Sequence, residues 1–328
     1  MKKTVFTLCS NNYLSQAKIL FESLIKFNPD FEFVIGLVDK KSNTIDYPAF
    51  IKCEIIEIES IFEDYNVFLD MYSRYNITEI NTAVKPFFFK YLLDSCQEND
   101  QVYYFDPDIE IFHSLIDLVT ILEKQNVVLT PHLLSPIFDD SEAAPSESYI
   151  INAGLYNLGF MGLKKCEESL KLINWWSDKC EKNCYIDMSK GIFVDQSWIS
   201  HAPIFFEGVH ILRSNNYNVA YWNLHERVVK KENGKYYVNG EFPLVFFHFS
   251  GYNPLNPDIL AKYQHKYDFT NMPLLKSIFD EYASKLMGAD YNRMTRIKCY
   301  YVSPITASSI KIKIKKFIKK SLVFVLKS

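Results

Sequence analysis

The sequence predicts an α/β protein in which a mostly parallel sheet is flanked by helices. Short apolar runs that fit strands alternate with helical stretches of about 12 residues, the pattern of βαβ units. Hydrophobic residues make up 48% of the 328 residues and charged residues only 23%, so the chain can bury a large core. Glycine (10) and proline (13) are scarce, which excludes collagen-like and linker-like chains.

Two patterns assign the elements of the N-terminal half. Residues 4–9 (TVFTLC) form an apolar run that fits a first strand. Apolar side chains at Ala17, Leu20, Leu24 and Phe27 then recur at helical spacing, which predicts a helix. The same patterns predict the other elements of this half, namely strands at 31–38, 51–58, 101–105 and 127–130 and helices at about 81–94 and 114–124.

The second half of the chain is less regular. Residues 151–163 hold three of the ten glycines, so we expect a β-bulge or a close backbone approach there. An apolar face at Leu170, Ile173, Trp176 and Cys180 predicts a helix. The remaining elements are a strand at 244–249 and a helix at 273–287. Ligands of mostly parallel sheets bind at the carboxyl ends of the strands, so we expect the site there.

Charge divides the chain at Asp290. Of the 36 basic residues, ten follow Asp290, whereas all 39 acidic residues lie at or before it. We therefore expect one domain at 1–290 and a basic tail at 291–328. The seven cysteines are odd in number and scattered, which does not fit a disulfide framework and favours free thiols in a reducing cytosol. No run of about 18 apolar residues exists, so we expect no membrane span.

Residues 310–327 (IKIKIKKFIKKSLVFVLK) combine lysines with apolar side chains. On a helix, one face carries Ile310, Ile314, Phe317, Ile318, Ser321 and Val325. Such a helix suits an anionic lipid surface, so we expect a cytoplasmic protein that lies peripherally on the inner face of the membrane. The period-two alternation at the start also fits a strand, and a solvated tail is a further alternative. We expect no nucleic-acid partner, because apolar residues interleave the lysines and the body is acidic.

Asp106 and Asp108 are the strongest local signal for chemistry. They follow the strand at 101–105, and side chains two residues apart on a strand point the same way. Carboxylate oxygens suit Mg²⁺ or Mn²⁺ bound together with a phosphate-bearing substrate. The alternative is a simple turn around Pro107, because Asp and Pro are common turn residues.

Three further features each have a structural and a functional interpretation. His248 lies in an apolar strand ahead of Ser250-Gly251, so it is either a core histidine or a third metal ligand. Asp195-Gln196 precedes a short helix, where Asp195 either caps the helix or serves the site. Asn152-Ala153-Gly154 is either a β-bulge or part of the site.

Taken in chain order, these features resemble a known pattern. The motifs are Asn12-Tyr13 after the first strand, Asp106-x-Asp108, Asn152-Ala153-Gly154, Asp195-Gln196 and His248-Phe-Ser-Gly251. Together they resemble the nucleotide-sugar glycosyltransferases of the GT-A type, which have a Rossmann-like sheet. The closest group is family 8, which contains bacterial lipooligosaccharide galactosyl- and glucosyltransferases and glycogenin, or a sister family of it. The resemblance covers residues 3–256.

The resemblance implies a hexosyltransferase that uses a UDP-sugar and a saccharide or lipid-linked saccharide acceptor of the bacterial surface. It implies that Asp106, Asp108 and His248 hold Mn²⁺ or Mg²⁺, which bridges the diphosphate and acts as a Lewis acid. The other implied contacts are Thr7, Asn12 and Tyr13 at the base and ribose, Lys85 at the phosphates or Asp195, Gly251 in the closing motif, and Asn152, Asp195 and Gln196 at the donor sugar and reaction face.

The sequence departs from the family pattern in two places. Tyr252-Asn253-Pro254 stands where the family has a lysine that grips the diphosphate, and Arg213 or Arg227 are candidates to replace it. The polar segment 217–227 (YNVAYWNLHER) has no counterpart in the family, so it either holds substrate groups or forms a buried hydrogen-bonded turn. Family 8 enzymes retain the anomeric configuration. If this enzyme inverts instead, Asp195 is the first candidate for the general base.

Two other functions fit parts of the pattern. A metal-dependent phosphatase or phosphotransferase of the haloacid-dehalogenase type could use Asp106 as nucleophile. In that family, however, the Asp-x-Asp motif lies near the first strand and continues with Thr or Val where this sequence has Glu110. An inactive glycan-binding module is the non-enzymatic alternative, and the intact Asp106, Asp108 and His248 argue against it. Acceptor choice is expected to depend on loops at about 60–80 and 132–150, whose sequences do not indicate which acceptor is bound.

Overall fold

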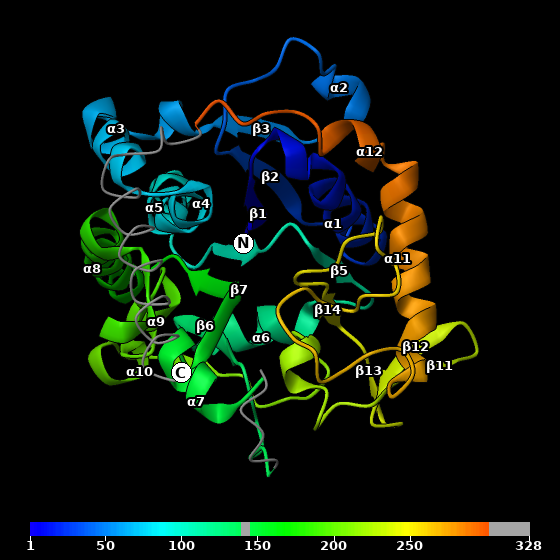
Figure 1. The fold of residues 1–328 in the computed structure, drawn as a ribbon. Coiled ribbons are helices and arrows are strands. Elements are labelled where there is room, and N and C mark those ends of the chain that lie inside the picture. The colour runs from blue at the N-terminus through cyan, green and yellow to red at the C-terminus, as the bar shows by residue number, and fades with distance from the viewer. Residues whose placement is uncertain (139–144, 302–328) are drawn as a thin grey trace, which may run out of the picture.

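The computed structural model describes residues 1–138 and 145–301, and its centre is a seven-stranded sheet (Figure 1). The strands lie in the order β10 (Val209–Ile211), β6 (Val127–Pro131), β7 (Tyr156–Lys164), β4 (Gln101–Phe105), β1 (Lys3–Cys9), β2 (Glu32–Leu37) and β3 (Glu54–Glu57). All neighbouring pairs are parallel except those that β7 makes with β4 and β6. The predicted α/β fold with a mixed, mostly parallel sheet is therefore confirmed.

Alternating side chains of the central strands feed a core on each face of the sheet, as period-two geometry requires. Phe6 of β1 lies in one core and Val5 in the other, which we call the α5-side core and the α1-side core. The helices that line the α5-side core include α4 (Ile77–Ala83), α5 (Lys85–Asp94) and α8 (Glu167–Asn183). The α1-side core is covered by α1 (Leu14–Phe27) and α6 (Ile116–Lys124). Both faces of the sheet are thus buried.

A third core, which we call the C-terminal core, packs beside the sheet and contains α11 (Lys276–Gly288). The small sheet β11 (Val229–Glu232), β12 (Lys235–Val238) and β13 (Phe242–Pro243) adjoins it. The antiparallel pair β5 (Ile109–Ile111) and β14 (Phe246–His248) joins this C-terminal region to the central sheet. In this pair His248 stands opposite Ile109, directly after the aspartates of the predicted metal site.

The remaining elements are short helices and one strand pair. They are the helices α2 (Tyr47–Phe50), α3 (Tyr65–Arg74), α7 (Glu147–Ala153), α9 (Gln196–Ile199), α10 (Ala202–Phe205) and α12 (Tyr291–Met294), the 3₁₀ helices at Asn11–Tyr13, Ile58–Ile61, Met188–Lys190, Tyr221–Asn223 and Pro273–Leu275, and the strands β8 (Ile186–Asp187) and β9 (Ile192–Phe193).

Several predicted elements differ in extent, and one differs in kind. The helix expected at 81–94 is two helices that meet at Val84, and the strand at 51–58 is limited to β3. The interpretation of residues 152–154 as a β-bulge is wrong, because Asn152 and Ala153 lie in the last turn of α7. Gly154 follows with a φ of 112°, a conformation that glycine adopts at little cost and that ends the helix.

Residues 291–301, where we expected the tail to begin, lie against the body. Tyr291 is buried in the C-terminal core, Met294 in the α1-side core and Tyr301 in the α5-side core. The division at 290 stays a prediction, and the amphipathic segment 310–327 lies outside the described residues. Among the helices that the structure describes, none is both long and apolar enough to cross a membrane.

Packing of Met294 predicts that α12 stabilises the body. Met294 is 0% exposed, so Met294→Ala should lower the free energy of unfolding by about 2–5 kcal/mol in a urea titration. Met287→Ala on α11 is the matched control, because Met287 is 44% exposed and its loss should cost less than about 0.5 kcal/mol. Equal costs for both variants would show that α12 does not contribute to the core.

Candidate active site

The candidate metal site, which we call the metal site below, forms where the turn after β4 meets the end of β14. The turn is closed by a hydrogen bond from the Ile109 N–H to the Asp106 carbonyl (3.1 Å). The β5–β14 pairing then brings His248 against it, with Nε2 3.0 Å from Asp108 Oδ1 and 3.6 Å from Asp106 Oδ2. One ligand atom from each of the three residues lies within 4.8 Å of the others.

The two carboxylates converge for a different reason from the one we expected. Neither Asp106 nor Asp108 belongs to a strand, because β4 ends at Phe105 and β5 begins at Ile109. The tight turn, with Pro107 at its centre, aims both carboxylates at His248. The prediction that Asp106 and Asp108 point the same way therefore holds, but turn geometry rather than strand alternation aligns their side chains.

The donor set fits a hard divalent cation such as Mn²⁺ or Mg²⁺. It offers carboxylate oxygens and one imidazole nitrogen in a compact cluster. Burial opposes a charge on His248, but Asp108 and Asp106 outweigh it and raise the pKa of the imidazole. The two carboxylates thus favour a positive charge at this position, and a bound cation would supply one.

A buried ion pair lies beside the metal site. Lys85 Nζ is 2.7 Å from Asp195 Oδ2, and both side chains are 2% exposed. The ammonium also donates to the Leu158 carbonyl (2.8 Å) and lies 4.3 Å above the ring of Tyr104. Tyr104 in turn donates its hydroxyl hydrogen to Asp106 Oδ1 (2.5 Å). These contacts connect the ion pair to a metal ligand.

Such a pair is costly to bury, which favours a functional role. Burial raises the pKa of Asp195, although Lys85 opposes this effect. Taking two charges out of water costs several kcal/mol per ion, so a buried pair is a weak source of stability. Charged groups with perturbed pKa values cluster at functional sites.

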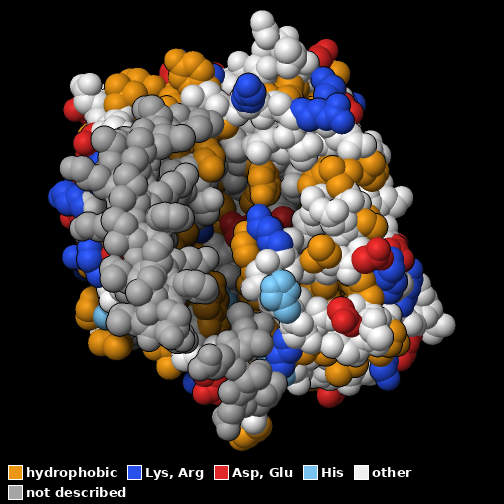
Figure 2. Space-filling view, viewed as in Figure 1, with side chains coloured by type: hydrophobic (Ala, Val, Ile, Leu, Met, Phe, Trp, Pro, Cys, Tyr) orange, Lys and Arg blue, Asp and Glu red, His pale blue; other side chains and the backbone are white. Residues whose placement is uncertain are grey.

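The metal site and the ion pair line one pocket of about 440 Å³. Asp106 and His248 lie in its wall together with Lys85 and Asp195. Aromatic rings complete much of the remaining wall, namely Tyr149, Phe193, Tyr221, Trp222 and Tyr263. Figure 2 shows acidic side chains at the bottom of a hollow near the middle of this face. Larger hollows elsewhere on the described part of the chain, of about 500, 640, 880 and 950 Å³, contain none of these residues.

The pocket wall contains buried polar atoms that have no hydrogen-bond partner within the described part of the chain. They include Trp222 Nε1 and His248 Nδ1. In native proteins more than about 90% of buried polar groups are paired, so unpaired atoms around one pocket need an explanation. A polar ligand with several hydroxyl or phosphate oxygens would satisfy them.

The structure brings five of the predicted site residues into this pocket wall: Lys85, Asp106, Asp195, Gln196 and His248. Asp108 completes the metal cluster. Asp195 lies at the start of α9, as expected, but its side chain does not cap that helix. The side-chain amide of Gln196 donates to the Ala153 carbonyl (2.6 Å), which ties α9 to α7.

None of the three residues expected at the base and ribose lies in the pocket wall. Burial and then Asp108 raise the pKa of the Tyr13 phenol, so this ring is close to the cluster. Asn12 Oδ1 accepts a hydrogen bond from Ser10 (2.7 Å). Thr7 is fully buried in β1, and its Oγ1 has no partner among the described residues.

Gly251 lies beside the pocket in a conformation that requires glycine. Its φ is +75°, and a Cβ there would come within 2.7 Å of the Tyr263 ring. Its neighbours Ser250 and Tyr263 both line the pocket. Gly251 therefore shapes the wall by allowing a close approach rather than by contacting a ligand with a side chain.

Three predicted contacts are not brought to the pocket. Asn152 donates its side-chain N–H to the Ser148 carbonyl of its own helix (2.8 Å) and does not line the pocket. Arg213 lines a separate hollow, and Arg227 is buried among carbonyl groups. Neither arginine lines the pocket, so their positions do not support the prediction that one of them replaces the lysine of the closing motif.

Asn157 is a pocket residue that the sequence analysis missed. It is the second residue of β7, and Asn157-Leu158-Gly159 starts five residues after the start of Asn152-Ala153-Gly154. Its amide lies in the pocket wall, whereas Asn152 lies on α7. The repeated Asn-x-Gly pattern was the available signal, and only the position of the helix end shows which copy reaches the site.

The comparisons with known proteins agree with this architecture. No family model matches the chain. Two proteins of Bacillus subtilis (strain 168) are similar to it in sequence. Uncharacterized protein YfnF is 23% identical over 289 residues, which cover 86% of this chain and 91% of YfnF. Uncharacterized protein YfnD is 24% identical over 249 residues, which cover 75% of this chain and 76% of YfnD.

Solved glycosyltransferase structures share the fold. The galactosyltransferase LgtC, crystallised with donor and acceptor sugar analogs, matches with a TM-score of 0.53 and 15% identity over 86% of this chain and 95% of LgtC. The bifunctional glycosyltransferase WbbM matches with a TM-score of 0.53 and 15% identity over 89% of this chain and 52% of WbbM. At these identities the likeness establishes the GT-A fold, as the sequence predicted.

The close approach of Gly159 to the His248 ring predicts that a glycine at position 159 is essential for metal binding. A Cβ at Gly159 would lie 2.4 Å from His248 Cε1 and 2.8 Å from Asn157 Oδ1, closer than atoms pack. Gly159→Ala should therefore displace His248 and weaken Mn²⁺ binding at least about tenfold in isothermal titration calorimetry, as loss of metal orientation does. Gly288→Ala is the control, since its Cβ meets nothing within 4 Å. Unchanged Mn²⁺ affinity in Gly159→Ala would contradict the arrangement.

Proposed function

We propose that this protein is a metal-dependent glycosyltransferase that moves a hexose from a nucleotide-diphosphate sugar, a UDP-sugar, to a saccharide or lipid-linked saccharide of the bacterial surface. One observation carries the proposal, namely that a cluster suited to Mn²⁺ or Mg²⁺ and a buried ion pair line the same pocket. The GT-A fold supports it, because LgtC has this fold and was crystallised with donor and acceptor sugar analogs.

The pocket residues have complementary tasks in such a transfer. Asp106, Asp108 and His248 would hold the cation, which supplies charge neutralisation for the departing diphosphate. Asp195 and Gln196 are buried in the pocket wall, where the carboxylate of Asp195 can stabilise positive charge that develops on the sugar ring. The aromatic rings exclude water, which strengthens these electrostatic effects.

The pairing of Asp195 with Lys85 supports retention of the anomeric configuration. Inversion needs a carboxylate that takes the acceptor proton on the face opposite the leaving group. Of the two carboxylates in the described pocket wall, Asp106 is a metal ligand and Asp195 already pairs with Lys85 at 2.7 Å. In the retaining course, the acceptor proton passes to the departing diphosphate on the same face of the sugar.

Removal of the metal ligands tests the function. We expect wild-type protein with Mn²⁺ to release UDP slowly from one preferred UDP-sugar without acceptor, and to do so faster when acceptor saccharides are added. Asp106→Ala and Asp108→Ala should each lower this rate at least about 100-fold, because the cation contributes several kcal/mol to charge stabilisation. Asp178→Ala, on the exposed face of α8, is the matched control and should retain the wild-type rate.

The same assay separates the alternatives. A phosphatase would release inorganic phosphate from unrelated phosphate esters, and a glycan-binding module would release neither product. Activity of Asp106→Ala or Asp108→Ala within a few-fold of wild type would exclude the metal assignment.

We also propose that the protein works in the cytoplasm on the inner face of the membrane. The basic amphipathic segment 310–327 supports this location, since each lysine near an anionic surface contributes about 1 kcal/mol. All seven cysteines are free thiols, which fits a reducing compartment. A lipid-linked acceptor would lie at the same surface.

Deletion of residues 305–328 tests the membrane proposal. The full chain should sediment with vesicles that contain phosphatidylserine or phosphatidylglycerol, and the truncated chain should stay in the supernatant. Vesicles of phosphatidylcholine alone are the control and should bind neither form strongly, because the attraction is electrostatic. Equal binding of both forms to anionic vesicles would exclude the segment as the anchor.

A further inference from the structure

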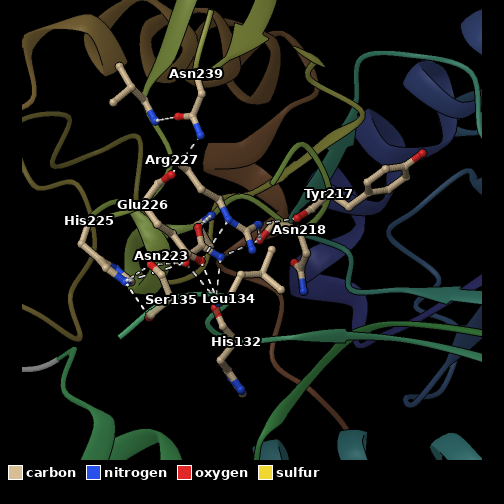
Figure 3. Close-up of polar contacts among 12 residues, drawn as sticks. His132, Leu134, Ser135, Tyr217, Asn218, Asn223, His225, Glu226, Arg227 and Asn239 are labelled. Carbon is tan, nitrogen blue, oxygen red and sulfur yellow. Dashed lines mark hydrogen bonds and ion pairs between the residues drawn. The ribbon is translucent and has the colours of Figure 1, made fainter. Parts of the chain in front are cut away.

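The polar segment 217–227 packs against residues 132–135 at one wall of the pocket (Figure 3). Arg227 stands at its end, with the guanidinium buried and donating to the carbonyl groups of Tyr217 and Asn218. Burial lowers the pKa of Arg227 to about 10, and Glu226 opposes this effect. The arginine therefore serves to hold the backbone of its own segment rather than to bind phosphate.

Glu226 attaches the segment to the loop after β6. Its carboxylate accepts hydrogen bonds from the Leu134 N–H (3.0 Å) and from the Ser135 hydroxyl (2.7 Å). It also lies 3.4 Å from Arg227 Nε. Charge-assisted hydrogen bonds of this kind are stronger than neutral ones, so the two chain segments form one rigid wall.

Asparagine side chains connect this wall to β7. Asn218, with a φ of 52°, donates through Nδ2 to Thr130 Oγ1 (2.9 Å) and to Asn157 Oδ1 (3.0 Å). Asn157 Oδ1 also accepts from the Gly159 N–H (3.1 Å), so the orientation of the Asn157 amide is determined. Its Nδ2 must then donate to His132 Nε2 (3.2 Å).

His132 is consequently neutral, with its proton on Nδ1. The Asn157 side chain donates a hydrogen to His132 Nε2, so Nε2 is the acceptor and carries no proton of its own. Burial lowers the pKa of His132 to about 4, so the ring stays uncharged at neutral pH. This part of the pocket wall is thus polar but carries no charge.

Trp222 lies between the neutral wall and the metal site. Its ring meets His132 edge to face at 5.4 Å and His248 at 5.2 Å. The side chain is 4% exposed and lines the pocket, yet its indole Nε1 has no hydrogen-bond partner among residues 1–138 and 145–301. The indole groups of Trp176 and Trp198, by contrast, donate to the carbonyls of Asp195 and Asn183.

We propose that the indole N–H of Trp222 donates a hydrogen bond to a hydroxyl of the transferred sugar, and that segment 217–227 is the rigid support that holds this donor in place. The inference rests on the proposed function and adds a specificity-determining residue to it. A buried N–H without a partner costs about 1–3 kcal/mol, which a bound ligand recovers. The rigid support means that little ordering is needed when the sugar binds.

The surroundings of Trp222 favour a hydroxyl over a phosphate group. Its neighbours His132 and Asn157 are neutral, and the lysine of the described pocket wall, Lys85, is already paired with Asp195. A phosphate would need cationic partners, whereas a sugar hydroxyl is satisfied by neutral donors and acceptors. We therefore expect the diphosphate at the metal ligands and the sugar against Trp222.

Nuclear magnetic resonance of the indole groups tests the contact in the unaltered protein. The chain has four tryptophans, so four indole N–H signals are expected, each assigned by its loss in a single Trp→Phe variant. With Mn²⁺ replaced by diamagnetic Mg²⁺, the preferred UDP-sugar should shift the Trp222 proton signal downfield, and UDP alone should not. An unshifted Trp222 signal under saturating UDP-sugar, or an equal shift with UDP alone, would overturn the inference.

Binding by Trp222→Phe provides the second measurement. This variant keeps the ring packing but removes the donor, so the Kd for the preferred UDP-sugar should rise about five- to tenfold while the Kd for UDP stays unchanged. Trp175→Phe is the matched control, because Trp175 packs on Phe205 and Phe206 away from the pocket. Wild-type affinity of Trp222→Phe for the sugar nucleotide would contradict the contact. Wild-type protein that binds no nucleotide sugar would overturn the proposed function together with this inference.

Discussion

The antiparallel pairing of β14 with β5 is the interaction on which the site depends. It joins residues far apart in sequence, places His248 opposite Ile109 and lets the Phe249 N–H donate to the Asp108 carbonyl (2.9 Å). The turn at Asp106–Asp108 alone offers two partly exposed carboxylates. The pairing of β14 with β5 adds His248 as the third candidate ligand and as part of the pocket wall. The C-terminal core therefore contributes directly to the chemistry.

Close packing around this pairing leaves little freedom. Gly159 of β7 allows His248 to approach the sheet, and the Asp106 N–H donates to the Gly159 carbonyl (2.8 Å). Tyr104 holds one oxygen of Asp106, and Lys85 lies over the ring of Tyr104. A change in one of these groups displaces the next, because packed interiors transmit strain. This coupling links the metal ligands to the Lys85–Asp195 pair.

The pocket separates charged groups from neutral polar groups. One part of the wall carries the carboxylates with Lys85 and His248, whereas the part formed by Asn157, His132 and Trp222 is uncharged. A nucleotide sugar has the same division, with charge on its diphosphate and neutral hydroxyl groups on its sugar. Complementarity of this kind gives specificity, since a misplaced charge would lose its solvation without gaining a partner.

The α/β class, most of the strands and the three residues of the candidate metal cluster could be predicted from the sequence, because hydrophobic periodicity and the Asp-x-Asp and His-x-x-Gly motifs are local signals. The sequence also indicated Lys85 and Asp195 through the family resemblance. The folded chain was needed to show that Asn157 rather than Asn152 lines the pocket, because this depends on where α7 ends and β7 begins. It likewise assigned Arg227 to the support of a wall and Trp222 to the pocket, since both roles arise from contacts between β6, β7 and segment 217–227 that no local pattern encodes.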